Sequence, residues 1–536
     1  MPFTSPILHS DSLAQAWLKR VHRSEHMVAL RFEEQAWTYA QLHARTLNIA
    51  RQFDQRQMHK GDRVLILMDN GPTFISTFFA AQITGLIPVP LSPRSSHERI
   101  AYVMEDCNAS LIAYDHNLSE RIVEQHRAQS YGGSLLKMSE TVEADFVERA
   151  IPLSPACAFI QYTSGSSGDA KGVMISHQAA LNNIQSFTEA MGLQATDSFS
   201  SMLPLFHDMG LLCFGLAPLL LGHTLWLYRA ESLQLHRWLE DLDKFQITHT
   251  GAPDSLLQIA NRVVSETHRY SFEHLKMLIC GSEPVRQDSI ETFGRRFNAS
   301  HALAPAYGMA ELSLCASLTR FPCSPRINQL GQVASGRAIE GVEIAIHKED
   351  GTPQDTGASG EIVVRSPAAM MGYWGKPDAT KLTFTDAGFF KTGDLGFLDE
   401  EGYLYVIGRI KNLLIKSGEK YSAHDIESIA QSIHGVRRAA VVQSTDSTIY
   451  AVMEVDRRLL NEPSHLSAIE QALKRASFQA HGIAPDICGF VASGALPSTE
   501  NGKLKHASLR ASIDAHNFDA IWSQQLKGLH NAIAMA

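Results

Sequence analysis

The stretch "IQYTSGSSGDAKGVMISH" at residues 160–177 joins an apolar run to a turn rich in serine and glycine that contains one lysine. The apolar run predicts a strand, and the turn follows it directly. Oriented backbone N–H groups and hydroxyls in such a turn are suited to hold polyphosphate. A short run of serine and glycine is also common in solvated loops, so the stretch alone leaves both interpretations open.

The spacing excludes the loop of an ordinary P-loop ATPase. A Walker loop places four residues between its first glycine and a Gly-Lys-Ser/Thr sequence. Here Gly165 is followed by Gly168, and Lys171 is followed by glycine and valine. A phosphate-binding role therefore requires a different kind of loop.

The composition is that of a globular protein with more than one domain. The chain has 536 residues, of which 44% are hydrophobic and 19% charged, and a formal net charge of −9. This length exceeds one ordinary core, so at least two domains are expected. The negative charge, spread without long runs, argues against nucleic-acid binding. Seven single cysteines without a CxxC pair predict a reducing, cytoplasmic location and no metal–thiolate site.

No membrane span is expected from the sequence. The N-terminus lacks the charged and then apolar pattern of a signal peptide. The only stretch of spanning length covers residues 210–227 and contains Pro218, Gly222 and His223. A spanning helix tolerates this combination poorly, so a buried helix followed by a turn and a strand is predicted there.

Strand-like apolar runs alternate with helical patterns over most of residues 1–400. This alternation predicts an α/β fold, with a large N-terminal domain of covered β-sheets and helices. After the opening turn, Ser176 can cap a helix that ends at Gly192. The pattern changes near residue 408, where a smaller segment of strands and helices begins. We therefore expect domains at residues 1–410 and 411–536, the second a small α+β domain.

Four further motifs follow the first along the chain. They are "AYGMAEL" at 306–312, "FKTGDLG" at 390–396, "GRIKNLLIKSGEKYSAHDIE" at 408–427 and "LPSTENGKLKH" at 496–506. Each motif alone is weak, because a core tyrosine, a solvated glutamate or a simple turn explains it equally well. Their order and wide separation, taken jointly, argue against agreement by chance.

Together the motifs resemble those of the adenylate-forming superfamily, which includes acyl-CoA synthetases, fatty acyl-AMP ligases, peptide-synthetase adenylation domains and luciferases. The resemblance covers nearly the whole chain and implies an AMP-forming ligase that uses ATP and Mg²⁺. In such enzymes a carboxylate attacks the α-phosphorus of ATP and expels pyrophosphate, so two anions that repel must be aligned and neutralised. The opening loop is then similar to the one that these enzymes fold over the phosphates.

The resemblance implies which residues contact ATP. Tyr307, followed by Gly308, would stack on adenine, as an amphipathic ring suits. Gly281 and Ser282 would line the same base. The phosphates would be held by residues of the first motif, namely Thr163, Ser164, Gly165, Ser166, Ser167, Gly168 and Lys171.

The resemblance also implies a metal ligand and a ribose site. Glu311 would act in catalysis by holding Mg²⁺, a hard cation that prefers carboxylate oxygen. Asp394, with Arg409 nearby, would bind the ribose hydroxyls, because a carboxylate accepts hydrogen bonds from both.

The lysine of "NGKLK" matches the catalytic lysine of the family. Lys503 would bridge the carboxylate and the α-phosphate, a contact that suits a point charge on a flexible stem. In the family the mobile C-terminal domain then swings about a hinge, where Lys411 falls. The swing would remove Lys503 and bring the turn around Gly418 to the thiol channel, as a lid-type gating step. A surface lysine in a loop is the plain alternative for Lys503.

Two motifs indicate a fatty acid as the substrate. "LPLFHDMGLL" at 203–212, and "YGMAE" with Ala310 where many relatives carry threonine, look more like fatty acyl-AMP ligases than like acetate or aryl-acid enzymes. His207 is the expected acyl-side catalytic residue, with a hydrogen-bonded core histidine as the alternative. The apolar stretch after His207 would suit a medium- or long-chain acid.

Two sequence features bear on the thiol acceptor. Their resemblance points to the phosphopantetheine thiol of an acyl carrier protein. Fatty acyl-AMP ligases, however, typically carry an extra segment that is associated with their failure to use CoA, and this chain joins Glu311 to Gly336 without an evident insertion. An acyl carrier protein is therefore the expected acceptor, with CoA, and hence a fatty acid–CoA ligase, as the alternative.

Two other classes of protein remain as alternatives. A non-catalytic nucleotide- or acyl-binding relative would be expected to lack Lys503 or Glu311, and both are present. A luciferase-like oxidative activity would need a substrate that the sequence does not reveal. An assay for light or oxygen uptake would distinguish this last class.

Overall fold

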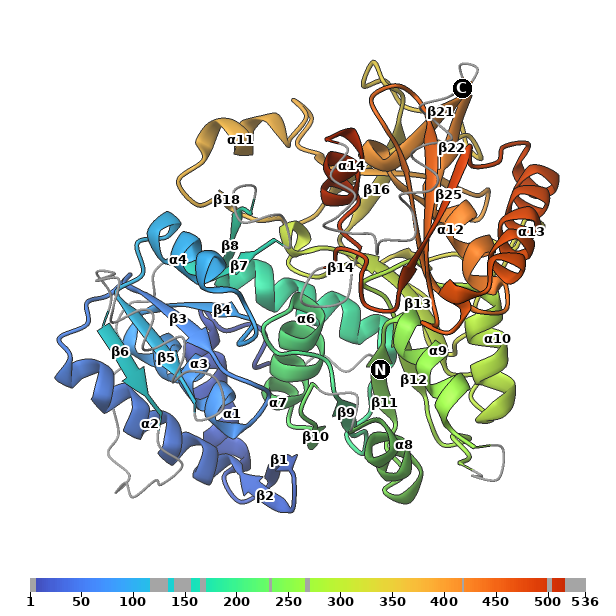
Figure 1. Ribbon diagram of the computed structural model, residues 1–536. Helices are drawn as coiled ribbons and strands as arrows, with labels where there is room; N and C mark the ends of the chain where they lie inside the picture. The colour runs from blue at the N-terminus through green and yellow to red at the C-terminus, as the bar shows by residue number, and fades with distance from the viewer. Residues whose placement is uncertain are drawn as a thin grey trace. The chain divides into compact units, whose positions relative to one another are not determined.

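The computed structural model describes residues 6–115, 134–138, 156–163, 170–230, 234–265, 270–416, 419–498 and 504–515 (Figure 1). The chain divides into two compact units, each of which is described by itself. The first comprises Met1–Ala345, Val363–Thr392 and Leu398–Tyr405, and the second comprises Ile346–Ile362, Gly393–Phe397 and Val406–Ala536. The expected boundary between residues 410 and 411 separates the N-terminal domain from a C-terminal domain that is expected to move. This boundary stays a prediction.

The largest sheet of the first unit has nine strands in the order β15-β14-β13-β12-β11-β9-β10-β1-β2. Neighbouring strands from β13 to β1 are parallel, and antiparallel pairs form both ends of the order. Parallel pairing needs crossover connections, which agrees with the alternation in the sequence. The strands are β1 (Val28–Phe32), β2 (Gln35–Thr38), β9 (Phe199–Ser201), β10 (Leu225–Leu227), β11 (His249–Ala252), β12 (Met277–Cys280), β13 (Leu303–Gly308), β14 (Cys315–Leu318) and β15 (Arg337–Ala338).

Two smaller sheets also belong to the first unit. One is parallel, with the order β4-β3-β5-β6, and the other is antiparallel, with the order β18-β8-β7. The apolar runs "RVLILM" without its final Met68, "IPVPL" and "AFIQY" lie in β3, β4 and β7. The strands are β3 (Arg63–Leu67), β4 (Ile87–Leu91), β5 (Leu111–Tyr114), β6 (Ser134–Lys137), β7 (Cys157–Tyr162), β8 (Gly172–Ser176) and β18 (Gly372–Tyr373).

Helix α6 (His177–Met191) begins and ends where the sequence places caps. The hydroxyl of Ser176 accepts a hydrogen bond from the backbone N–H of Ala179 at 3.0 Å, and Gly192 ends the helix with a φ of 63°. Glycine adopts this left-handed conformation without steric cost. The predicted helix between Ser176 and Gly192 is therefore confirmed.

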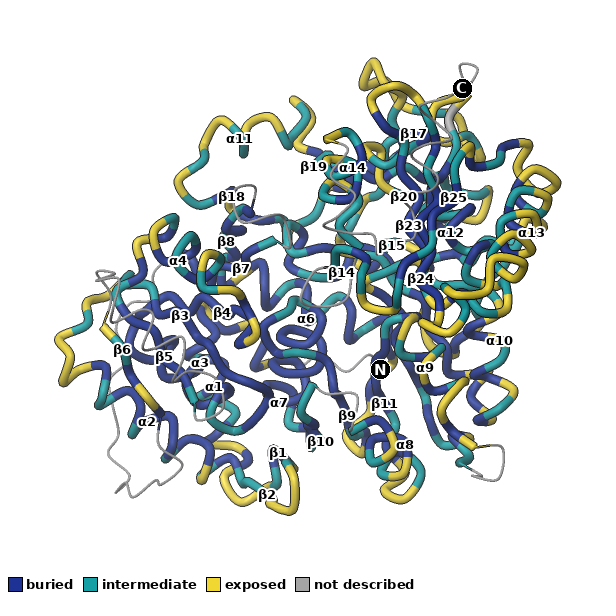
Figure 2. Tube along the Cα trace, viewed as in Figure 1, coloured by how far each residue is buried: buried dark blue, intermediate teal, exposed yellow. Residues whose placement is uncertain are grey.

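The other helices of the first unit differ in how they are buried. Helix α3 is apolar all round, as a core helix is, and is buried from Phe74 to Thr84. Figure 2 shows it dark blue, whereas α13 of the second unit is exposed along much of its length. The helices of the first unit, besides α6, are α1 (Leu13–Ser24), α2 (Tyr39–Gln55), α3 (Pro72–Thr84), α4 (His97–Asp106), α7 (Ala217–Leu221), α8 (Leu235–Lys244), α9 (Asp254–Val263), α10 (Gln287–Arg296) and α11 (Pro377–Leu382).

Residues 210–227 form a buried helix, a turn and a strand, as predicted. The helix starts as a π-helix (Met209–Leu216), continues as α7 and ends at Gly222, and β10 follows. Within the described ranges, no helix combines the length and the hydropathy that crossing a membrane would require.

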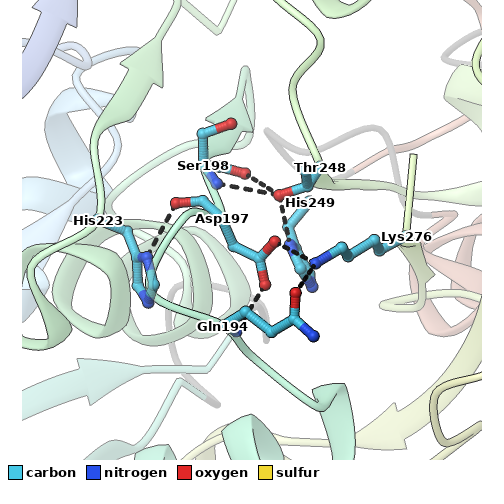
Figure 3. Close-up of polar contacts among 7 residues, drawn as sticks. All are labelled: Gln194, Asp197, Ser198, His223, Thr248, His249 and Lys276. Atoms are coloured by element: carbon cyan, nitrogen blue, oxygen red, sulfur yellow. Dashed lines mark hydrogen bonds and ion pairs between the residues drawn. The ribbon is translucent and has the colours of Figure 1, made fainter. Parts of the chain in front are cut away.

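A buried polar cluster lies at the amino ends of β9, β11 and β12 (Figure 3). Nζ of Lys276 lies 2.6 Å from Oδ1 of Asp197, whose side chain is 1% exposed. The hydroxyl of Thr248 donates to the carbonyl oxygen of Ser198 at 3.1 Å and lies 2.9 Å from Nδ1 of His249. Burial lowers the pKa of His249 to about 3. Because ligands of open parallel sheets bind at the carboxyl ends of strands, we assign this cluster to the stability of the fold.

The second unit contains a three-stranded sheet of order β23-β24-β25 and a hairpin of β21 and β22. β23 and β24 are antiparallel, and β24 and β25 are parallel. The predicted strand "AAVVQS" lies in β23 except for its last residue, Ser444. The predicted strand "IYAVMEV" is β24, and the predicted helix "SAIEQALKRASF" lies in α13. The elements are β21 (Leu413–Lys416), β22 (Glu419–Ser422), α12 (Ala423–Ser432), β23 (Val436–Gln443), β24 (Ile449–Val455), α13 (Pro463–His481), β25 (Ile487–Ala492) and α14 (His506–Asp514).

One more sheet has four strands in the order β16-β17-β19-β20. The motif "FKTGDLG" lies within β19, so it forms a strand and not a simple turn. The strands are β16 (Glu343–His347), β17 (Gly360–Arg365), β19 (Phe390–Leu398) and β20 (Leu404–Arg409).

Candidate active site

The carboxyl ends of β11, β12 and β13 lie side by side, because these strands are parallel. Gly281 and Ser282 directly follow β12, and Tyr307 and Gly308 end β13. A Cβ atom at Gly281 would lie 3.5 Å from the carbonyl oxygen of Ala306, so the two segments are adjacent. Ligands of open α/β sheets bind at this end of the strands. The structure thus brings together the residues that were expected to line an adenine.

Two backbone positions at this edge are constrained. Ser282 has a φ of 68°, in a region that non-glycine residues rarely adopt and that is enriched at functional sites. A Cβ atom at Gly308 would overlap the carbonyl oxygen of Leu314, so this position of "AYGMAEL" requires glycine. Tyr307 is half-buried, which leaves part of its ring accessible, unlike a core aromatic.

The opening motif, residues 160–177, contains the end of β7, the connection between the two strands and the whole of β8. Beyond the last strand pair, the backbone N–H of Thr163 donates to the carbonyl oxygen of Lys171 at 3.0 Å. The backbone N–H of Lys171 donates in return to the hydroxyl of Thr163 at 3.1 Å. The guanidinium of Arg99, on α4, donates to the carbonyl oxygen of Thr163 at 2.7 Å. These bonds fix the base of the loop.

Tyr373 connects the lysine of the loop to Glu311. Its hydroxyl donates to Oε1 of Glu311 at 3.0 Å, and Nζ of Lys171 lies 4.5 Å from the centroid of its ring. The backbone N–H of Met370 donates to the carbonyl oxygen of Glu311 at 2.8 Å. A cation and a carboxylate are therefore both held on one aromatic side chain, which is 5% exposed.

A second network holds the other end of the loop. The hydroxyl of Tyr102 donates to the carbonyl oxygen of Ala170 at 2.8 Å, and Nζ of Lys376 donates to that hydroxyl at 3.0 Å. Nζ of Lys376 also lies 3.0 Å from Oδ1 of Asp106. Oδ2 of Asp106 accepts from the hydroxyl of Tyr162 at 2.7 Å. Burial, together with the negative charge of Asp106, raises the pKa of Tyr162, so the phenol remains a donor.

The loop that carries His207 is supported by an amide from outside it. The side-chain amide of Asn70 donates to the carbonyl oxygens of Leu203 and Tyr228, each at 2.9 Å. Its oxygen accepts from the backbone N–H of Leu205 at 2.8 Å. Asn70 thus satisfies three backbone groups and fixes the path of the chain before His207.

The residues around His207 are fixed on both sides of it. The side chain of Gln161, on β7, donates to the carbonyl oxygen of Phe206 at 2.6 Å. A Cβ atom at Gly210 would overlap the carbonyl oxygen of Pro204, so the glycine of "HDMG" is required by the backbone. The π-helix begins at Met209, and such helices are frequent at functional sites. The imidazole of His207 is half-buried.

The donor set around Glu311 suits one kind of metal site. Among the described residues, no group of three or more His, Cys, Asp or Glu side chains could hold an ion by itself. Mg²⁺ usually keeps several waters and binds one or two carboxylates together with substrate phosphates. A single carboxylate close to a lysine of a phosphate-type loop fits an ion of this kind.

Asp394 and Arg409 pair with each other in the second unit. Nε of Arg409 lies 2.9 Å from Oδ1 of Asp394, whose side chain is 7% exposed. Lys411, the expected hinge residue, is exposed in a short 3₁₀ turn (Ile410–Asn412) that separates β20 from β21. The proximity of Asp394 to Arg409 agrees with the expectation from the sequence, while their role stays a prediction.

Two motifs that lie far apart in the sequence meet within the second unit. Glu427, the last residue of "GEKYSAHDIE", accepts from the backbone N–H of Val441 at 2.8 Å and lies 2.6 Å from Nε2 of His506, the last residue of "NGKLKH". Burial would raise the pKa of Glu427, but hydrogen bonds from His424 and His506 outweigh it and lower the pKa. The pKa of His506 is raised: burial opposes this, and the carboxylate outweighs burial.

Part of the expected site lies outside the described residues. These positions are Ser164, Gly165, Ser166, Ser167, Gly168, Gly418 and Lys503. Their expected roles stay predictions. The described ends of their segments are Thr163 and Ala170, Lys416 and Glu419, and Ser498 and Leu504.

The sequence did not single out Tyr373, Arg99 or Asn70. Tyr373 follows a glycine with a φ of 137° in "MMGYWG", and no spacing rule connects this stretch to Glu311. Arg99 and Asn70 act on backbone carbonyls, a role that leaves no mark in a motif. Only the pairing of strands and loops in three dimensions reveals these contacts.

The sequence of this chain matches a family model and is similar to known fatty-acid ligases. The model of the AMP-binding enzyme family matches residues 17–374. The long-chain-fatty-acid–AMP ligase FadD23 of Mycobacterium tuberculosis is 27% identical over 93% of each chain. The medium-chain-fatty-acid–acyl-carrier-protein ligase JamA of Moorena producens is 26% identical over 88% of this chain and 89% of its own.

A solved structure agrees with the fold described above. It comes from structural and functional studies of fatty acyl-adenylate ligases from E. coli and L. pneumophila, and it has a TM-score of 0.86 at 23% sequence identity. It covers 95% of this chain and 99% of its own. This similarity confirms the predicted fold class, a large α/β domain of covered sheets.

Proposed function

Because the chain belongs to the AMP-binding enzyme family, we propose that it activates a fatty acid with ATP and passes the acyl group to a thiol. The family assignment confirms the resemblance drawn from the motifs. The acid is a medium- or long-chain fatty acid, and the acceptor is the phosphopantetheine thiol of an acyl carrier protein. The names of FadD23 and JamA support this acid and this acceptor.

The observation that carries the proposal is the arrangement of Lys171, Tyr373 and Glu311. A cation at the end of a serine- and glycine-rich loop and a carboxylate are held on the same tyrosine, at 4.5 Å and 3.0 Å. This arrangement supports a site in which Lys171 would bind phosphate and Glu311 would hold a phosphate-bound cation. The adjacent carboxyl ends of β12 and β13 support binding of the base of the same nucleotide there.

The first half-reaction is attack by the fatty acid carboxylate on the α-phosphorus of ATP. One carboxylate oxygen forms the new bond to phosphorus, and the bond to the oxygen that bridges the α- and β-phosphates breaks. Pyrophosphate leaves with that electron pair, and acyl-AMP remains. No proton is transferred, so the task of the protein is to position two anions and neutralise growing charge.

Each charged residue has a place in this step. Lys171 and the loop that follows Thr163 bind the phosphate oxygens, and Lys503 aligns the carboxylate with the α-phosphate. Glu311 would hold Mg²⁺, which neutralises phosphate oxygens when bound. Tyr307 stacks on the adenine, and Asp394 with Arg409 binds the ribose.

The acyl group is bound on the side of His207. The apolar residues of the π-helix and α7 follow this histidine directly, and they are buried. A long hydrocarbon chain would be bound by burial of its apolar surface. His207 would then lie at the carboxylate end of the acyl site.

In the second half-reaction the thiol attacks the carbonyl carbon of acyl-AMP. The new carbon–sulfur bond forms, AMP leaves with the electron pair of the carbon–oxygen bond, and the thiol proton passes to solvent. The second domain turns about Lys411, which removes Lys503 and brings the turn at Gly418 to the thiol channel. CoA is the alternative acceptor, because the chain has no evident insertion after Glu311.

The proposal is tested by product analysis with both acceptors. The enzyme is incubated with ATP, Mg²⁺ and a fatty acid, and with either a holo acyl carrier protein from the same genome or CoA. We expect AMP and an acylated carrier protein, detected by intact-protein mass spectrometry. Efficient acyl-CoA formation without carrier loading would replace the acceptor by CoA, and release of ADP instead of AMP would contradict the reaction itself.

A further inference from the structure

Three arginines gather at one end of the β23-β24-β25 sheet. They line a hollow with a volume of about 450 Å³, together with Asp456 and Ser493. We call this hollow the arginine basin, defined by Arg437, Asp456, Arg457, Arg458 and Ser493. All five residues belong to the second unit and none is among the residues assigned to ATP, acid or metal.

The strand register explains why distant parts of the sequence meet here. Val436 pairs with Val455, and Val455 pairs with Ala492, so β23 begins at the level where β24 and β25 end. Arg437, which directly follows Val436, is thereby placed beside Asp456, Arg457 and Arg458, which directly follow β24. The register shifts between Val436 and Arg438, and a bulge of this kind redirects the side chain of the residue within it, which is Arg437.

The basin is positive although the chain as a whole is negative. It contains three guanidinium groups and one carboxylate, whereas the formal net charge of the chain is −9. Arg437 and Asp456 form an ion pair at 2.5 Å, with exposed fractions of 54% and 55%. Arg457 and Arg458 are also exposed. An exposed pair contributes little to folding stability, so the fold does not require this concentration of cations.

We propose that the arginine basin is the docking surface for the acidic face of the acyl carrier protein that accepts the acyl group. This inference rests on the proposed function and names the part of the chain that recognises the partner. Open, exposed charges act mainly on the rate and specificity of association, as a transient encounter between enzyme and carrier requires. Guanidinium groups pair with carboxylates in two-point contacts, which suits several acidic side chains on one helix.

The position of the basin fits a partner of protein size. Arg437 lies near the start of β23, and Gln443 at its end hydrogen-bonds the backbone N–H of Ile415, in β21, at 2.8 Å. Six residues of extended strand span roughly 20 Å. The basin and the β21–β22 hairpin therefore lie at opposite ends of β23. A small domain has a radius of gyration of about 13 Å for 100 residues, so a carrier protein could cover the basin while its thiol arm extends beyond the contact surface.

The experiment measures carrier loading by two charge-reversal variants, Arg457→Glu and Arg458→Glu. Arg475→Glu, on the exposed side of α13, is the matched control with the same change in net charge. We expect each basin variant to raise the KM for the holo carrier protein by roughly tenfold, since like charges then meet across the interface. The dependence of loading on salt should weaken in parallel. Acid-dependent ATP–pyrophosphate exchange and thermal melting should match the wild type, and Arg475→Glu should load normally.

A charge swap makes the test specific. A carrier variant with lysine in place of one acidic residue should load better with Arg457→Glu than the native carrier does. Equal loading by the wild type and both basin variants would overturn the docking surface while the proposed function stands. The basin variants could also lose activity with CoA and keep wild-type activity with 3′-dephospho-CoA. That result would overturn the docking surface and assign the basin to the 3′-phosphate of CoA. A wild type that loads no carrier at all would contradict both the acceptor and the docking surface.

Discussion

The hydroxyl of Tyr373 donates a hydrogen bond of 3.0 Å to Oε1 of Glu311, across 62 positions of sequence. The same ring lies 4.5 Å from Nζ of Lys171. Tyr373 therefore sets the position of the two charged groups that the proposed reaction needs beside the phosphates. It acts through these groups and is a positioning residue.

Replacement Tyr373→Phe removes the hydrogen bond to Glu311 and keeps the ring. A carboxylate ligand that loses its hydrogen-bonding partner binds metal roughly 10- to 100-fold more weakly. We expect a corresponding rise in the Mg²⁺ concentration that supports ATP binding, measured by calorimetry. Binding of ATP in the presence of EDTA should not change.

Replacement Tyr373→Leu also removes the ring beneath Lys171. A cation–π contact contributes about 1 kcal/mol, so ATP binding in EDTA should weaken roughly fivefold as well. Identical Mg²⁺ dependence in wild type, Tyr373→Phe and Tyr373→Leu would show that Tyr373 does not position Glu311.

Replacement Lys503→Ala tests the role proposed for the C-terminal lysine. If Lys503 aligns the carboxylate with the α-phosphate, adenylation should slow by roughly 10²- to 10³-fold, as for loss of one preorganised charge contact. Purified acyl-AMP should still be consumed by the acceptor at nearly the normal rate. Lys505→Ala, two residues away, is the matched control. Equal damage to both half-reactions would argue against a lysine that acts in the first step alone.

Replacement Lys276→Met tests the buried cluster of Figure 3. It leaves the carboxylate of Asp197, with a side chain that is 1% exposed, without its cation. Removing one partner of a buried pair costs about 3 kcal/mol, so the melting temperature should fall by several degrees. The double variant Lys276→Met/Asp197→Asn should recover part of the loss. A melting temperature equal to that of the wild type would show that the pair adds nothing to stability.

The stability of the first unit should decrease in acid because of its buried histidines. Burial lowers the pKa of His249 to about 3 and that of His43 to about 4. An unfolded histidine binds a proton near pH 6.5, so protons favour the unfolded chain below that value. The stabilisation is fully present above about pH 6.5 and is lost as the pH falls toward the pKa values of these histidines in the folded protein.

Thermal melting between pH 7.5 and pH 4 measures this effect. His249→Asn, which cannot take up the proton, should melt lower at pH 7.5 and lose less stability on acidification. His59→Asn, at an exposed position, should follow the wild type. If the melting temperature of His249→Asn depended on pH as steeply as that of the wild type, the imidazole of His249 would not contribute to the loss of stability in acid.

Local features of the fold were predictable from the sequence because their signals are local. Ser176 and Gly192 mark the two ends of α6 through capping chemistry that involves neighbouring residues alone. The alternation of apolar runs with helical patterns likewise indicated an α/β fold with covered sheets. The π-helix at Met209–Leu216 was not predictable, because a uniformly buried apolar run has no periodicity that separates it from an α-helix.

The site was predictable only where a motif carries it. The motifs named Thr163, Lys171, Tyr307 and Glu311 as candidates, and their roles stay predictions. Tyr373 was not named, because its contact to Glu311 depends on the pairing of β18 with β8. The arginine basin was not predictable from the sequence for a similar reason. Arg437, Arg457 and Arg458 are ordinary surface charges in the sequence, and only the register of β23 and β24 brings Arg437 to the other two.

The central claim is that this chain forms acyl-adenylates, and ATP–pyrophosphate exchange without any acceptor tests it most directly. Labelled pyrophosphate should enter ATP only when a fatty acid is present, with medium- or long-chain acids more effective than acetate. The exchange should require Mg²⁺ and should fall roughly 10²- to 10³-fold in Lys503→Ala. Absence of exchange with every acid tested, from acetate to palmitate, would contradict the account.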